Sequence, residues 1–273
     1  MYAQMLISLR EAFEAALLIV IVASYLKRIG RPRLTYYLVL GGLVGVIASI
    51  ATGVIAYQTY VIVEEKALAE AVGAFIAVPV LTSVIYWMAV KGRNIKASVE
   101  EKVSEAVSSK SVFSISLLGL IFVYREGFET VLFILPLLFK EPVNTFIGIF
   151  IGVVGSLIIS YGIFKMGVKM NIRLFFYFTS ILLIFVASGI LGYGMHELFE
   201  YTEEIGLNLS PWSDYVYRLP IDSTNIFHEK GLIGGLLSVL FGYATKMELG
   251  RLIAQISYLL IGLGLVFKAY RAR

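Results

Sequence analysis

One charged motif occurs twice in this chain, each time inside an apolar stretch long enough to cross a membrane. The motif has the pattern R-E-x-x-E, and its copies are Arg10–Glu14 and Arg125–Glu129. The ten-residue windows that begin at the two arginines agree at six positions. A charged side chain at bilayer depth costs roughly 2.5–3.5 kcal/mol on insertion scales, and such residues mark functional sites by default. The repeat therefore predicts a functional site, and the simpler alternative is a pair of structural Arg–Glu bridges.

The spacing within each copy places its charged groups on one helix face. Residues three and four positions apart are neighbours on a helix, so Glu14 lies beside both Glu11 and Arg10. If the helices of the two copies face each other, four carboxylates converge, and these cannot all stay ionised without a cation or protons. Carboxylate oxygens are hard ligands that suit hard cations. We expect a metal site with the ligands Glu11, Glu14, Glu126 and Glu129, supported by Arg10 and Arg125.

A second group of potential metal ligands lies near the end of a later apolar stretch. Its members are His196, Glu197 and Glu200, and the first and last are four residues apart. It is not the H-E-x-x-H zinc motif, because Glu200 stands where that motif has its second histidine. We expect a site where the metal enters the path, and we include Glu70 at the start of another apolar stretch. The alternative is a solvated helix end.

The composition shows what kind of scaffold must position these residues. Hydrophobic residues make up 59% of the 273 residues and charged residues 15%, against about 25% charged in a soluble domain. The mean hydropathy of +0.85 agrees with this. We expect an all-α, multi-pass protein of the cell membrane with a single domain over residues 1–273, the lipid bilayer as its surroundings and no nucleic-acid partner. Because the chain has no cysteine, disulfides, thiolate metal sites and iron–sulfur clusters are excluded.

Hydropathy predicts seven transmembrane helices. The last one, about 252–267 within the region 251–268, is short, and its flanking basic side chains would have to reach the membrane surfaces. A glycine-rich segment, 231–243, is too short to span and is expected to be interfacial or re-entrant. The segment 92–111 has the pattern of an amphipathic helix and is expected on the membrane surface. The first six spans are expected at about 5–26, 34–57, 67–90, 112–139, 143–164 and 174–199.

The loop charges predict an orientation and a repeat. Fifteen lysines and arginines fall in loops on one side of the seven spans, and six on the other. The positive-inside rule then places the N-terminus outside and the C-terminus inside. The two motif helices would run in opposite directions, so the halves, about 1–91 and 112–200, would form a three-plus-three inverted repeat with one added helix. Such repeats are typical of transporters that bind their substrate near the midplane.

The paired motif on the first and fourth of seven expected spans resembles the high-affinity iron permeases, the oxidase-dependent iron transporters of fungi and bacteria. Residues 70–88 are similar to the third span of that family. Residues 194–200 resemble its H-E-L-Q-E-type segment, with Phe199 in place of the usual glutamine, which puts any role of that side chain in doubt. The regions 231–243 and 255–258 resemble its C-terminal pattern.

This resemblance implies inward transport of iron, either ferric or ferrous. Ferric ion is often handed over in this family by an external ferroxidase, so a ferroxidase or iron-delivery protein is an implied partner. Iron would be the cargo, with no permanently bound cofactor, and Glu11, Glu14, Glu126 and Glu129 would be its ligands.

Three other functions fit the same residues. A permease for another metal, such as manganese or lead, would use identical ligand types. A proton-coupled transporter of an organic substrate would use the glutamates as proton relays. A membrane-embedded di-metal carboxylate enzyme is disfavoured, because such enzymes add Glu-x-x-His pairs and neither motif holds a histidine. We therefore expect a transporter and not an enzyme.

Overall fold

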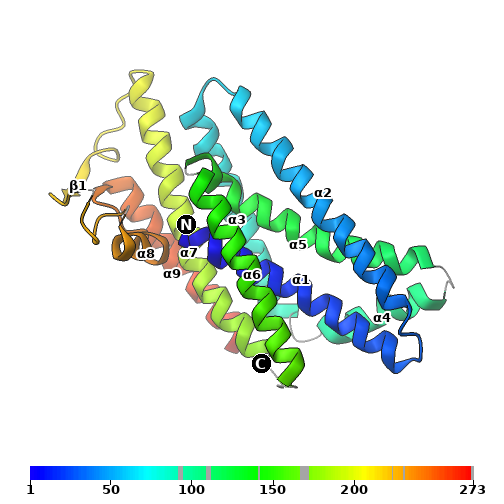
Figure 1. The fold of residues 1–273 in the computed structure, drawn as a ribbon. Coiled ribbons are helices and arrows are strands. Elements are labelled where there is room, and N and C mark those ends of the chain that lie inside the picture. Colours follow the sequence, from blue (N-terminus) through cyan, green and yellow to red (C-terminus); the bar gives the residue numbers. More distant parts are fainter. Residues whose placement is uncertain are drawn as a thin grey trace.

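The computed structural model describes residues 1–91, 95–108, 112–140, 142–166, 172–222, 224–229 and 231–271, and it shows a bundle of long helices (Figure 1). This confirms the expected all-helical class. The described helices are α1 (Tyr2–Arg28), α2 (Leu34–Ile62), α3 (Lys66–Lys91), α4 (Ile95–Ser108), α5 (Val112–Lys140), α6 (Pro142–Met166), α7 (Ile172–Glu204), α8 (Leu232–Phe241) and α9 (Leu249–Arg271).

The chain is a multi-pass membrane protein. In the described part of the chain, five helices are long and apolar enough to cross a bilayer, namely α2, α3, α6, α7 and α9. Their outer faces carry large apolar side chains, such as Ile47 of α2 at 66% exposed and Phe150 of α6 at 70%. Helices α1 and α5 have 27 and 29 residues, but each contains the three charged residues of one motif. Their composition, not their length, sets them apart from the other five.

The long helices pack in pairs that cross between the two halves of the chain. Helix α2 packs along α5, α6 along α1, and α3 along α7, while α1 and α5 also contact each other (Figure 1). The first two pairs are close: a Cβ at Gly41 of α2 would overlap the backbone of Ser116 in α5, and one at Gly152 of α6 would overlap Ser8 in α1. Small residues allow membrane helices to approach in this way. The arrangement brings the two motif helices together at the centre.

Helix α4 confirms the expected helix in 92–111, within its described residues 95–108. Its apolar face is covered by protein, because Val99 and Val103 are buried in a cluster with Val22 and Leu26 of α1. An ion pair of 2.9 Å between Arg28 Nη2 and Glu100 Oε1 also joins α4 to the end of α1. The helix is thus packed against α1 and α5, rather than resting on the membrane with a lipid-facing apolar side.

The C-terminal part differs from the sequence expectation in two ways. Helix α9 has 23 residues, about 34 Å at 1.5 Å per residue, so the final helix is longer than the predicted 251–268. The hydropathy-based prediction ended at charged residues, whereas the helix continues beyond them. Secondly, strands β1 (Tyr215–Arg218) and β2 (Lys246–Glu248) form an antiparallel pair that was not predicted. This pair brings the start of α9 close to the end of α7.

Candidate functional site

The first copy of the motif is buried inside the bundle. Arg10, Glu11 and Glu14 are 2%, 1% and 4% exposed. Arg10 bonds both of its glutamates: its Nη1 pairs with Glu11 Oε1, and its Nη2 lies 2.7 Å from Glu14 Oε1. The helical spacing therefore produces the expected pairing. A guanidinium can hold two carboxylates at once because its donors form a rigid fork.

The second copy repeats this pairing in more open surroundings. Arg125 Nε lies 3.3 Å from Glu126 Oε1 and 3.1 Å from Glu129 Oε1. The Glu126 side chain is 2% exposed, whereas that of Arg125 is 43% exposed. The guanidinium carbon of Arg125 stands 5.0 Å from the ring centre of Trp87, within the range of a cation–π contact.

Three of the four predicted carboxylates lie close together. Oxygen atoms of Glu11, Glu126 and Glu129 all lie within 4.8 Å of one another. In each of the three, the Oε2 atom is buried and has no hydrogen-bond partner among the described residues. A buried, unpaired carboxylate oxygen is unfavourable, and a bound cation would satisfy it. Glu14 lies beside this group but is not part of the close trio.

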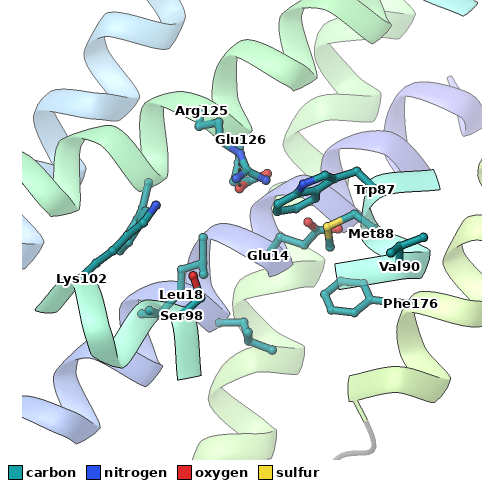
Figure 2. Close-up of a pocket in the computed structure, with 13 residues that line it drawn as sticks. Glu14, Leu18, Trp87, Met88, Val90, Ser98, Lys102, Arg125, Glu126 and Phe176 are labelled. Carbon is teal, nitrogen blue, oxygen red and sulfur yellow. Dashed lines mark ion pairs between the residues drawn. The ribbon is translucent and has the colours of Figure 1, made fainter. Parts of the chain in front are cut away.

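A cavity of about 450 Å³ opens next to the trio (Figure 2). Glu14, Trp87, Arg125 and Glu126 lie at one end of it, and Lys102 comes from α4 at the other. Its other lining residues are mainly apolar and come from α1, α3, α4, α5 and α7. The cavity therefore joins the charged centre to the end of the bundle that α4 covers.

The second predicted group also comes together. Ligand atoms of His196, Glu197 and Glu200 lie within 4.8 Å of one another. Glu248 of β2 joins them, with its Oε1 2.7 Å from His196 Nδ1. Burial raises the pKa of the Glu248 carboxyl, but the hydrogen bond from His196 and the charge of Arg251 outweigh this effect and hold the pKa below its usual value.

Glu70 takes a separate position on α3. Its two carboxylate oxygens accept hydrogen bonds from the hydroxyls of Tyr60 in α2 and Tyr193 in α7. Because Tyr193 lies one helical turn before His196, Glu70 is connected to the second group through α7 without being one of its close members. The two tyrosines tie three helices together at this point.

Glu248 and Trp87 have site contacts that were not predicted from the sequence. Glu248 depends on the β1–β2 pair, whose only sequence signal is the short aromatic and β-branched run Tyr215–Tyr217. Trp87 lies near the end of an apolar stretch, where the more common role of tryptophan is that of an interfacial anchor. Its place beneath Arg125 depends on how α3 packs against α5. Local sequence patterns do not predict how distant helices pack.

Nearly the whole chain is similar to one family of known proteins. The profile described as the iron permease FTR1 family matches residues 1–267. A protein of Archaeoglobus fulgidus without a described function is 43% identical, over 99% of this chain and 96% of its own length. Proteins named ferrous iron permease EfeU are 30% identical in Escherichia coli O6:K15:H31, over 95% of this chain and 93% of theirs, and 30% identical in Yersinia pestis, over 98% and 93%. No solved structure matches.

Proposed function

Because this chain belongs to the iron permease FTR1 family, we propose that it carries iron inward through a carboxylate site between α1 and α5. The strongest support is the convergence of Glu11, Glu126 and Glu129, each with a buried oxygen that lacks a hydrogen-bond partner. The names of the EfeU relatives favour ferrous ion as the cargo. If ferric ion is carried instead, an external ferroxidase would supply it.

The residues of the two motifs have different roles in moving the ion. Glu11, Glu126 and Glu129 bind it, since hard oxygen ligands suit iron ions as well as manganese. Arg10 and Arg125 neutralise and orient these carboxylates while no ion is bound. Glu14 faces the cavity from the same helix turn, so it receives the ion as it leaves the trio.

The loop charges and the position of the cavity support inward transport. By the positive-inside rule α4 would lie on the inner side of the membrane, and the cavity extends from the trio toward α4. On the other side of the trio, Ile7 lies one turn before Glu11, and Phe133 lies one turn after Glu129. Both of these apolar side chains are 0% exposed. The site is therefore closed toward the outside and connected to the inside.

The packing of the helices supports seven spans arranged as an inverted repeat. If α1, α2 and α3 correspond to α5, α6 and α7, then the α1–α6 contact corresponds to the α5–α2 contact, and both exist. The α1–α5 and α3–α7 contacts correspond to themselves under the same operation. The second helix of each half thus packs against the first helix of the other half. The substrate site of such repeats lies where the halves meet.

The test is uptake into vesicles that contain the purified protein, with ferrous, ferric and manganese ions measured in parallel. Ferrous uptake that Glu129→Gln abolishes, with normal insertion of the variant, is the expected result. Faster uptake of manganese than of either iron ion would make the chain a permease for another metal. Unchanged iron uptake in the Glu129→Gln variant would rule out the trio as the transport site.

A further inference from the structure

We propose a second metal site at the outer end of α7, where His196, Glu197 and Glu200 bind a divalent metal ion and Glu248 of β2 orients the imidazole. The proposal rests on the proposed function in one respect, because the expected ion is the ferrous cargo. The site itself is distinct from the trio between α1 and α5.

The spacing of the three ligands suits a metal ion. His196 and Glu200 are four residues apart, so they lie on one face of α7, and the ligand atoms of all three residues are within 4.8 Å of one another. An imidazole nitrogen with two carboxylate oxygens is a set that suits iron and its neighbours among the divalent metals.

Glu248 fixes the way in which His196 presents its ring. An ionised carboxylate can only accept hydrogen bonds, so His196 Nδ1 must be the donor in the 2.7 Å contact with Glu248 Oε1. The Nε2 atom of a neutral imidazole then keeps its lone pair for a metal. Metal-binding histidines almost always donate their other ring nitrogen to a carboxylate or carbonyl in this way.

The second oxygen of Glu248 points to a ligand independently of the cluster. Glu248 is 2% exposed, and its Oε2 is buried without a hydrogen-bond partner among the described residues. Arg251 Nη1 is 4.0 Å away, too far for a hydrogen bond. Glu248 lines the same cavity as His196 and Glu200, so a metal-bound water there could donate to this oxygen.

The surroundings are suited to collecting cations. The cavity has a volume of about 960 Å³, and the acidic residues Glu203 and Asp214 also line it, against the basic Arg218. Negative charge around a concave site raises the local concentration of cations. One helical turn further into the membrane, Tyr193 bonds Glu70. Glu70 is therefore the next carboxylate along α7 from the proposed site, joined to the helix through Tyr193.

Metal counting on the full-length protein in detergent tests the proposal. Equilibrium dialysis with anaerobic ferrous ion should give two bound ions per wild-type chain and one in the His196→Ala variant. The Glu11→Gln, Glu126→Gln, Glu129→Gln triple variant should also keep one ion, and adding His196→Ala to it should remove that ion. If the triple variant does not fold, the single His196→Ala comparison decides. An unchanged ion count in the His196→Ala variant would overturn the outer site, whereas transport by the triple variant would overturn only the proposed function.

The role of Glu248 has its own readout. Loss of such a supporting carboxylate typically weakens metal binding about 10–100-fold, and we expect this for Glu248→Gln at the outer site. The visible spectrum of bound Co²⁺, which reports the ligand geometry, should change in the same variant. Glu204→Gln is the matched control, because it removes an equal charge from an exposed position of α7 that does not line the cavity. Wild-type affinity and spectrum in Glu248→Gln, or an equal loss in Glu204→Gln, would contradict the assigned role.

Discussion

The two copies of the R-E-x-x-E motif have the same internal pairing but different surroundings. In both, the arginine bonds the glutamates one and four residues later. The side chain of Arg10 is 3% exposed, however, while that of Arg125 is 43% exposed. The sequence pattern thus determines the local geometry, and the neighbouring helices determine the exposure.

The difference comes from the elements that surround the two arginines. Helix α4 lies between the two motif helices in the chain. It closes one end of the cavity that reaches Arg125, while the end of α3 contributes Trp87 beside that arginine. In the proposed metal site, the buried copy would therefore provide the fixed half, and the open copy would provide the connection to the cavity.

The largest effect should come from removing the buried arginine. Arg10→Ala leaves two buried carboxylates without their partner, and breaking a buried ion pair costs about 3–5 kcal/mol in soluble proteins. Arg125→Ala should cost clearly less, because water in the cavity can reach that position. The thermal unfolding midpoint in detergent, read with the fraction of monodisperse protein, measures both. Equal losses in the two variants would mean that the difference in exposure has no energetic consequence.

The next prediction separates the trio from Glu14. Glu11→Gln removes a ligand, so ferrous binding should weaken by at least the 10–100-fold that losing a supporting residue costs. Glu14→Gln should instead slow uptake while the ion still binds, because Glu14 lies on the cavity wall outside the close group. Dialysis of ferrous ion and vesicle uptake, measured on the same two variants, distinguish these effects. If Glu14→Gln weakens binding as much as Glu11→Gln, all four carboxylates act as one site.

Much of this arrangement could be predicted from the sequence, for identifiable reasons. Long apolar runs and the 3.6-residue period gave the helices, and the i, i+4 spacing gave the Arg10–Glu14 pair. Two arginines in equivalent motifs look alike in sequence, though, and their exposure depends on α4 and on the end of α3. Likewise, Glu248 reaches His196 only through a strand pair that joins residues about thirty positions apart. Local patterns predict which groups share a helix face, but not which distant element packs against that face.

The third prediction uses the one position of the motif at which the two copies have different residues. Gly127 faces α2 so closely that a Cβ would overlap the Ser49 side chain, whereas the first copy has Ala12 at this position. Gly127→Ala should therefore destabilise the protein by about 1–3 kcal/mol, as overpacking does. The double variant with Ser49→Gly should recover most of that loss. Thermal unfolding measures both, and Ala12→Gly, expected to cost about 1 kcal/mol or less, is the control for the first copy.

The smallest effect should come from the aromatic contact that only the open copy has. Trp87 lies beneath the guanidinium of Arg125 at 5.0 Å and is itself 39% exposed. A cation–π contact at such a site is worth about 0.5–1 kcal/mol. Trp87→Leu should therefore leave the protein folded and weaken the hold on Arg125. If that hold limits transport, uptake should change by about two- to fivefold, the rate equivalent of this energy. The uptake rate of Trp87→Phe, which keeps an aromatic ring, should lie between those of Trp87→Leu and wild type. Trp212→Leu is the control for loss of an indole elsewhere. A loss in Trp87→Leu as large as that in Arg125→Ala would show that the ring holds the guanidinium as firmly as the glutamates do, and the second copy would then be as rigid as the buried one.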